Sequence, residues 1–225
     1  MVPVEPVGKP KKAWLRAELH QEIAFIGGDD VCSPVSQDNG EFYCFRSDGV
    51  QYIGAPVMGQ YDNVKAGFAV ATTRLLLGLD YVLAKKVAVG GAAGVAFRGG
   101  GPTPALGSDF FPWQVEIRGD YFVAGETMAP KKLRVAAFLA TGMAQVDAMH
   151  EVGVFEDRTL VTQQVNPNSQ KVEAWKRLGR GFIAPGVFAW IPLGPGAVSV
   201  ELRFMVMFPA TSLVASPGIG YALGF

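Results

Sequence analysis

The sequence predicts an all-β protein, an eight-stranded antiparallel up-and-down transmembrane β-barrel. Three observations lead to this fold class. Apolar residues make up 49% of the 225 residues and charged residues only 18%, which is an apolar composition for a soluble protein. The 28 glycines and 15 prolines favour strands and turns over helices. Apolar and polar residues also alternate with period two over much of the chain, as in strands whose two faces meet different environments.

The eight predicted strands span, in chain order, residues 13–26, 66–83, 87–98, 113–123, 132–145, 174–191, 198–208 and 213–225. The first sets leucines and Phe25 against charged residues, with Gln21 as the one polar residue on its apolar face. The second alternates leucines with polar residues or glycine, and the third alternates valines with alanine and glycine. The fourth has the clearest pattern, because every odd-numbered position from Trp113 to Val123 is apolar or glycine.

The later strands are also better explained as strands than as transmembrane helices. The fifth sets Leu133 and Leu139 against Arg134, and the seventh alternates apolar residues with Ser199, Glu201 and other polar positions. The uncharged stretches around the sixth and eighth strands contain several prolines, which interrupt the hydrogen bonding that a membrane-spanning helix needs. Most of the eight segments reach the ~9–11 residues that a tilted membrane strand requires.

The connections alternate in length. Those after the second, fourth and sixth strands are short, whereas those after the first, third and fifth cover about residues 27–65, 99–111 and 146–173. Outer-membrane barrels have short periplasmic turns and longer extracellular loops. The sequence therefore predicts extracellular long loops and periplasmic termini, with residues 1–12 as a Pro/Lys-rich periplasmic linker and residues 13–225 as the barrel.

With these features the chain resembles the bacterial outer-membrane β-barrel proteins of the small, eight-stranded, OmpA-like kind. The resemblance covers about residues 13–225 and includes the last strand, "PGIGYALGF". In that family a final strand with alternate apolar residues before a terminal Phe is recognised by the barrel-insertion machinery. The resemblance implies a location in the bacterial outer membrane and an insertion signal formed by Ile219, Tyr221, Leu223 and Phe225.

Cys32 and Cys44, the only cysteines, both fall in the first long loop. In an oxidising compartment such a pair forms a disulfide. The intervening Asn39-Gly40 predicts a tight hairpin that brings the two cysteines together. The alternative, part of a metal site, lacks a nearby histidine or a further cysteine, and we expect no metal or cofactor.

The inward face of the predicted barrel carries charges of both signs. They are Arg16, Glu18, Glu22, Arg74, Asp80, Glu116, Arg118, Asp120, Arg134, Arg180, Glu201 and Arg203. The interior of an eight-stranded barrel is just wide enough for side chains to fill. We therefore expect these charges to pair and close the lumen rather than to line an ion path.

The two histidines do not predict catalysis. His20 faces inward beside Glu18 and Glu22, and His150 has no serine or threonine close in sequence. Nucleophilic catalysis needs a histidine with a hydroxyl nucleophile and an acid. We expect no enzymatic activity, and the net charge of zero indicates no nucleic-acid partner.

The sequence thus predicts a non-enzymatic outer-membrane barrel that anchors or scaffolds an envelope or surface assembly. Its expected partners are outer-membrane lipid and lipopolysaccharide, the barrel-insertion machinery, and periplasmic or surface proteins. One alternative is a small channel or transport pore. A further alternative is a soluble, calycin-like barrel that binds an apolar ligand, which would place apolar residues inside and charged residues outside.

Overall fold

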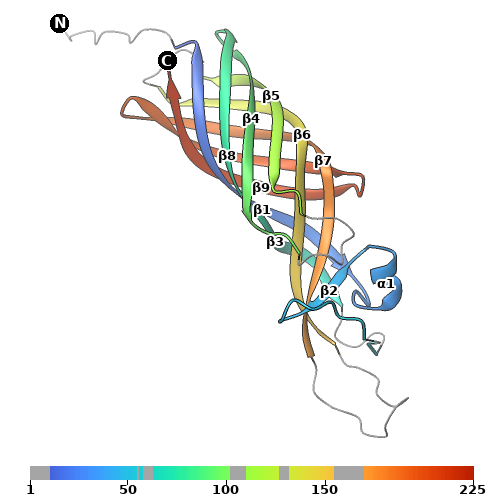
Figure 1. Cartoon of the computed structure of the whole chain (residues 1–225). Helices are drawn as coiled ribbons and strands as arrows, with labels where there is room; N and C mark the ends of the chain where they lie inside the picture. Colours follow the sequence, from blue (N-terminus) through green and yellow to red (C-terminus); the bar gives the residue numbers. More distant parts are fainter. Residues whose placement is uncertain (1–10, 55, 58–62, 102–109, 127–131, 155–169) are drawn as a thin grey trace, which may run out of the picture.

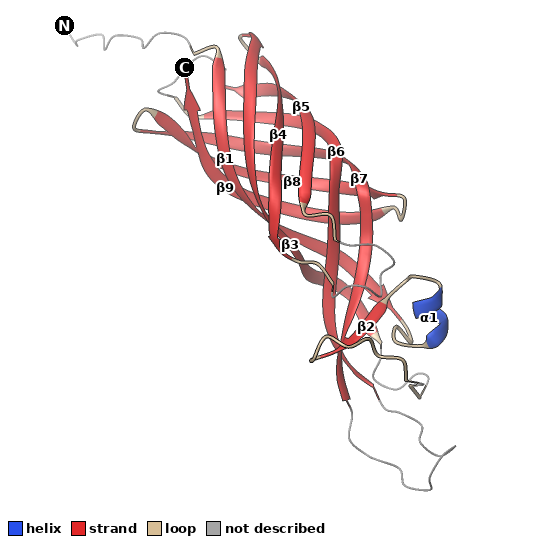
Figure 2. Ribbon diagram, in the orientation of Figure 1, coloured by secondary structure: helices blue, strands red, loops and turns tan. Residues whose placement is uncertain are grey.

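The computed structural model describes residues 11–54, 56–57, 63–101, 110–126, 132–154 and 170–225, so most of the predicted linker lies outside the described residues. The described residues are mostly in β-strands (Figure 2). Its elements are β1 (Ala13–Gly28), α1 (Pro34–Asp38), β2 (Tyr43–Arg46), β3 (Val64–Ala84), β4 (Val87–Arg98), β5 (Trp113–Ala124), β6 (Arg134–Val154), β7 (Gln170–Leu193), β8 (Gly196–Phe208) and β9 (Ser212–Gly224). Within these ranges, no helix is long and apolar enough to cross a membrane.

Eight of the strands close into a ring. The sheet order is β2-β7-β6-β5-β4-β3-β1-β9-β8, and β8 pairs in addition with β7, which joins the two sides of the barrel. Every pairing is antiparallel. Because each barrel strand lies next to its neighbours in sequence, the topology is up-and-down (Figure 1). The predicted all-β, eight-stranded antiparallel barrel is confirmed.

The first and last strands meet at the end of the barrel that carries the short turns. Trp14 pairs with Gly224, and the backbone N–H groups of Lys12 and Ala13 donate to the carbonyl oxygen of Phe225 at 3.1 and 3.2 Å. The described start of the chain and its last residue therefore lie together, at the opposite end from α1 and β2 (Figure 1). We call these two ends the turn end and the loop end.

Gln21, the polar exception on the apolar face, lies at a β-bulge. The register of β1 against β3 shifts just after Gln21, which displaces backbone carbonyls of β3 from the ladder. The Gln21 side-chain amide donates to the carbonyl oxygens of Ala71 and Thr72 at 3.3 and 3.4 Å and accepts from the Thr73 hydroxyl at 2.8 Å. Its polar groups are thus satisfied locally, which makes it compatible with an apolar surface.

The prediction of a loop at residues 146–173 is wrong for the first and last parts of this range, which belong to strands. β6 continues to Val154 and β7 begins at Gln170, so this hairpin extends well beyond β5, whose pairing with β6 stops at Ala144. The period-two pattern continues there, but with apolar residues such as Val152 and Val172 buried instead of exposed. A search for strands with an apolar outer face does not find this extension, because here the apolar residues are on the buried face.

The first long loop is also folded. It contains α1 and β2, and β2 pairs with the extended part of β7. The Ser33 hydroxyl accepts from the Ser36 N–H at 3.2 Å, and Pro34 follows at the start of α1, both common helix-start signals. Asn39 and Gly40 end this helix, so the predicted tight hairpin at Asn39-Gly40 is wrong.

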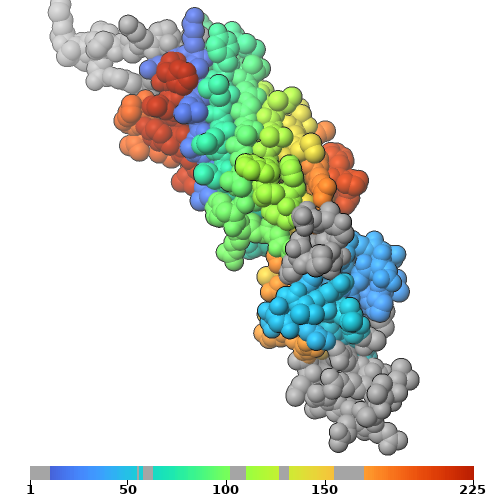
Figure 3. All heavy atoms as spheres, in the orientation of Figure 1, coloured from blue at the N-terminus to red at the C-terminus, as the bar shows by residue number. Residues whose placement is uncertain are grey.

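These segments form a small folded unit beyond the barrel, which we call the head: residues 29–54, 148–154 and 170–176. In the space-filling view α1 and β2 lie together past the green and yellow barrel strands (Figure 3). The predicted disulfide between Cys32 and Cys44 is present in the head. Its core consists of buried residues from all three segments: Val31, Phe42, Phe45, Tyr52, Ala148, Val152, Val154, Val172 and Ala174.

Candidate functional site

The barrel interior collects eleven of the twelve charges that the sequence assigned to it. Each has at most 5% of its surface exposed. They are Arg16, Glu18, Glu22, Arg74, Asp80, Glu116, Arg118, Asp120, Arg134, Glu201 and Arg203. They come from β1, β3, β5, β6 and β8, so strands far apart in sequence supply one cluster.

Arg180 is the exception, because it is exposed and does not lie in the interior. The ladder between β6 and β7 is irregular beside it, with register shifts on both sides of Val146. Gly179 has a φ of +143°, and Leu178 and Gly179 are buried in succession. This bulge interrupts the strict alternation from which an inward Arg180 was predicted.

A continuous chain of ion pairs crosses the middle of the lumen between β5 and β8. Arg118 donates to Asp120 at 2.8 Å and to Glu201 at 2.9 Å. Arg203 donates to Glu116 at 2.6 Å and also binds Glu201. Glu201 therefore binds two arginines, and each arginine binds two carboxylates. Removing any one of these side chains takes an ion-pair partner from another buried charge.

A second group lies beside this chain, on β1 and β3. Arg16 binds Asp80, with 2.5 Å between Nε and Oδ2, and also binds Glu18. The Ser199 hydroxyl donates to the second Glu18 oxygen at 2.8 Å and accepts from the Trp190 indole N–H at 3.2 Å. Polar groups from four strands thus share one hydrogen-bonded network.

A third group lies towards the loop end. The Arg74 guanidinium donates to Glu22 at 2.8 Å and to the backbone carbonyl of Gln145. The Gln145 side-chain amide donates to Asp147 at 3.0 Å, and Arg177 lies 3.5 Å from the same carboxylate. Ion pairs therefore continue along the lumen up to the base of the head.

At the turn end the interior is aromatic, a feature that the sequence reasoning missed. The rings of Trp14 and Trp190 lie 4.9 Å apart, and the Arg134 guanidinium stacks on them at 4.1 and 4.8 Å. Phe122 and Phe188 pack against Trp190 at 5.7 and 5.0 Å. The four aromatic residues occupy even-numbered positions in phase with Arg134 and the other inward charges, so extending that phase would have found them.

His20 meets a hydroxyl that the sequence did not place near it. Its Nδ1 lies 3.3 Å from the Ser216 hydroxyl, and its Nε2 lies 3.9 Å from Glu18. A Cβ at Gly218 would lie 2.6 Å from Nδ1, so glycine makes room for the ring. The side chains of His20, Ser216 and Glu18 are at most 2% exposed. A substrate has to reach its nucleophile, so this burial argues against catalysis by Ser216. Among the described residues, no cluster of His, Cys, Asp or Glu is arranged to hold a metal ion.

The outer face of the barrel is apolar and bordered by aromatic residues at both ends. Its centre carries exposed leucine, isoleucine and valine side chains, among them Leu77, Val115, Ile117, Leu139 and Val187. Tyr81, Tyr121 and Tyr221 lie next to the short turns. Phe25, Phe68, Phe97, Trp113 and Phe208 lie where strands approach the loop end.

The residues of the suggested insertion signal belong to this outer face. Ile219, Leu223 and Phe225 are exposed, and the half-buried Tyr221 donates its hydroxyl hydrogen to the Leu193 carbonyl at 2.8 Å. Recognition of these residues during insertion stays a prediction. No known family model matches this chain, and no curated protein is significantly similar to it.

Proposed function

We propose that this protein is a non-enzymatic bacterial outer-membrane barrel that anchors or scaffolds an assembly at the cell envelope. The observation that carries the proposal is the inverted distribution of side chains across the barrel wall. Charges are buried and paired inside, while leucine, valine, isoleucine and aromatic side chains cover the outside. Such a surface is costly in water and matches a hydrocarbon solvent.

The dimensions of the outer face support this proposal. On β5 the odd-numbered positions remain apolar or glycine over the 11 residues from Trp113 to Val123. At ~3.4 Å per residue and a tilt of about 45°, this stretch spans roughly 25 Å, the height of the apolar band of outer-membrane barrels. The aromatic residues at its two borders match the aromatic girdles that such proteins place at membrane interfaces.

The soluble, calycin-like alternative is not favoured by these features. A soluble barrel that binds an apolar ligand needs an apolar cavity inside and polar residues outside. Here Arg118 and Glu201 occupy the interior, and Ile117, 68% exposed, occupies the exterior. Both faces have the opposite character.

A pore is the second candidate function, and the packing of the lumen argues against it. Bridging ion pairs such as those of Arg118 and Arg203 fill the middle, and the aromatic residues around Trp190 fill the turn end. We expect reconstituted protein to give no stable single-channel conductance. Large, reproducible conductance steps would make transport the better proposal.

The arrangement of the two ends of the barrel supports the anchoring role. In the orientation proposed, the disulfide-bonded head lies outside the cell and the described chain ends lie in the periplasm. The head offers a folded surface to external partners, and the turn end is available to periplasmic proteins. The Ser216–His20–Glu18 group is buried inside the barrel, which supports a role without catalysis.

Detergent dependence tests the membrane proposal. The full chain should remain dispersed and show β-type circular dichroism in detergent micelles or lipid vesicles, and should aggregate when the detergent is removed. Monodisperse, folded protein in plain buffer would contradict the proposal.

A further inference from the structure

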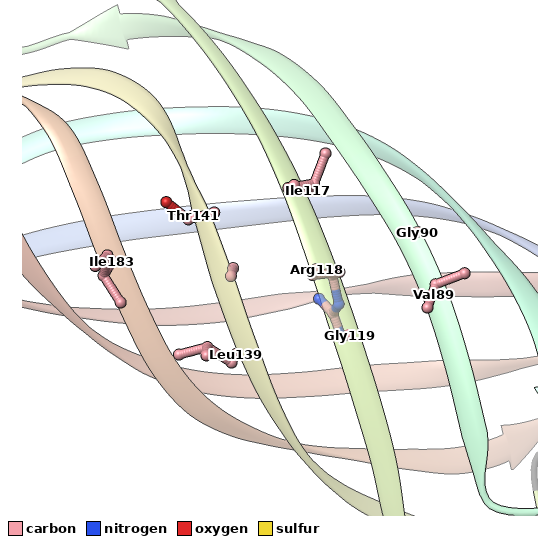
Figure 4. A pocket seen from close by; sticks show the side chains of 9 residues that line it. Val89, Gly90, Ile117, Arg118, Gly119, Leu139, Thr141 and Ile183 are labelled. Carbon is pink, nitrogen blue, oxygen red and sulfur yellow. The ribbon is translucent and has the colours of Figure 1, made fainter.

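A wide groove over β4 to β7 on the outer wall of the barrel is mainly apolar. Its volume is about 480 Å³, and each of the four strands supplies an apolar side chain, namely Val89, Ile117, Leu139 and Ile183 (Figure 4). Arg118 borders the groove as well, but it is paired with carboxylates of the lumen. Lipid chains of any kind would fill such a surface in a membrane, so the groove indicates no particular ligand.

The head has a smaller and more enclosed pocket between α1 and the segment that follows β2, at the loop end of the molecule (Figure 1). Its volume is about 140 Å³, which suits one side chain rather than a whole ligand. We call it the head pocket. Its walls include Pro34, Gln37, Asp38, Gln51, Tyr52 and Ile53.

The walls of the head pocket are fixed by the side chain of Gln37. Its amide donates to the carbonyl oxygens of Cys32 and Tyr52 at 3.1 and 3.0 Å, and its oxygen accepts from the Cys44 N–H at 3.3 Å. Both cysteines belong to the disulfide, so α1, β2 and the segment at Tyr52 are tied together. The pocket is therefore formed before an occupant arrives, which lowers the cost of binding.

Asp38 supplies a carboxylate to this pocket. The residue is exposed, and it makes no hydrogen bond or ion pair with the part of the chain that the structure describes. The surrounding sequence is acidic too, because residues 29–54 contain five acidic residues and one arginine. A concave surface with charge of one sign attracts the opposite charge, so the head pocket favours a cationic group.

Exposed aliphatic side chains accompany this carboxylate. Ile53 forms part of the pocket wall and is 83% exposed, and Val35 in α1 is 67% exposed. Residues three apart lie on the same side of a helix, so Val35 and Asp38 share one side of α1. A small inorganic cation would leave these aliphatic groups in water, whereas a side chain with a hydrocarbon stem and a charged end would cover them.

We propose that the head pocket binds an arginine side chain of a partner protein. The stem of the arginine packs against Pro34 and Ile53, its guanidinium binds Asp38, and an apolar neighbour in the partner covers Val35. Arginine suits this site better than lysine, because its planar fork can bind one carboxylate through two parallel hydrogen bonds. This inference deepens the proposed anchoring role and rests on it for the place of the partner, outside the cell.

The first experiment titrates the full chain in a non-ionic detergent with the synthetic peptide Gly-Ser-Val-Leu-Arg-Leu-Val-Ser-Gly and with the same peptide carrying norleucine instead of arginine. Isothermal titration calorimetry, corrected for titration into empty micelles, measures both affinities. The arginine peptide should bind about tenfold more tightly, the effect of one charge-assisted contact. A lysine peptide should lie between the two.

Variants of the acidic residues separate the pocket from the overall charge of the head. Asp38→Asn should bind the arginine and norleucine peptides equally. Asp29→Asn is the matched control, because Asp29 is also exposed in the head but does not line the pocket, and the substitution removes the same charge. It should keep the preference for arginine.

Variants of the aliphatic residues test the position of the stem. Ile53→Ser should weaken the binding of both peptides several-fold, since both stems contact this side chain. Val50→Ser is the control, because Val50 is also exposed but lies outside the pocket, and it should bind like wild type. Circular dichroism and a thiol assay establish that each variant is folded and disulfide-bonded before peptide is added.

The two proposals fail in different ways. If the folded wild type binds neither peptide or binds both equally, or if Asp38→Asn keeps the full preference, the arginine site is wrong while the membrane barrel stands. If Asp29→Asn loses the preference as Asp38→Asn does, overall charge explains the binding and the site is also wrong. Folded, monodisperse protein in plain buffer would overturn the proposed membrane role, and with it the extracellular partner, whatever the peptides show.

Discussion

The paired strands β6 and β7 run through both the barrel wall and the head, yet they bury opposite kinds of residue in the two parts. In the head part of β6 and β7, Val152 and Val172 are buried, whereas Glu151 and Lys171 are exposed. In the barrel part of the same hairpin, Arg134 is buried and Leu139 is 58% exposed. The backbone pairing is antiparallel throughout, so hydrogen bonding does not explain the difference.

The difference shows that strand pairing does not depend on which face of the strands is polar. The surroundings of each part decide which face carries the apolar side chains. The head has the distribution of a small water-soluble domain, with an apolar core and a disulfide. The barrel has the distribution that suits a hydrocarbon solvent. If the two parts do meet different solvents, the same kind of substitution should have opposite consequences in them.

The largest effect is expected from removing a charge inside the barrel. Arg118→Leu leaves the buried Asp120 without its arginine and leaves Glu201 with Arg203 alone, and should lower the free energy of unfolding by about 3–5 kcal/mol. Urea unfolding in lipid vesicles measures this loss. A stability within 1 kcal/mol of wild type, taken as roughly the value of an exposed pair, would mean that the interior is hydrated and the network contributes little.

A slightly smaller effect is expected from adding a charge to the outer face. Ile117→Arg places a cation in the middle of the apolar outer face and should lower the free energy of unfolding by roughly 2–4 kcal/mol, the penalty at a bilayer midplane. Ile117→Leu is the control and should be nearly neutral. Since Arg118 faces the opposite way one position along, wild-type folding and insertion of Ile117→Arg would mean that the strand register is wrong.

Loss of the disulfide should affect the head and spare the barrel. Replacing Cys32 and Cys44 with serine removes a cross-link of sequence separation 12, a change that typically costs about 2–4 kcal/mol. Hydrogen exchange should then accelerate in residues 29–54, while the strands β4 and β5 remain protected. Equal acceleration in both regions would show that the head and the barrel unfold as one unit.

The smallest effect is expected from the ion pair on the surface of the head. The ammonium group of Lys171 lies 2.6 Å from Glu151, and both side chains are largely exposed, so water screens their attraction. The hydrogen bond to Glu151 raises the pKa of Lys171, so any contribution is lost as pH rises through that pKa. Lys171→Ala should leave the unfolding midpoint unchanged at pH 7, and a clear loss of stability there would contradict the contrast with Arg118.

Much of the barrel could be predicted because its strands place alternate side chains in two unlike environments. Apolar and polar residues therefore alternate in the sequence with period two. That pattern located the eight barrel strands, and eleven of the twelve charges that it assigned to the interior are buried. It failed at Arg180, because a bulge changes the phase without a strong sequence signal. The pattern also failed to predict the strand extensions in the head, because there the apolar residues of β6 and β7 are buried.

Other features depend on contacts between distant segments. The stacking of Arg134 against Trp14 and Trp190 joins residues from β6, β1 and β7, and the approach of Ser216 to His20 joins β9 to β1. Alternation predicts that such side chains point inward, but it does not predict which of them meet. The strand register and the closure of the barrel decide that.

The most direct test of the central claim measures the depth of two positions in the same lipid sample. Nitroxide labels attached at Ile117→Cys and at Glu151→Cys, under non-reducing conditions that keep Cys32 and Cys44 bonded, report collisions with oxygen and with a water-soluble nickel complex. The label at position 117 should collide mainly with oxygen, because it lies on the apolar outer face of the barrel. The label at position 151 should collide mainly with the nickel complex, because it lies on the head. A nickel-accessible label at position 117 in lipid vesicles would contradict the assignment of the outer face to the membrane.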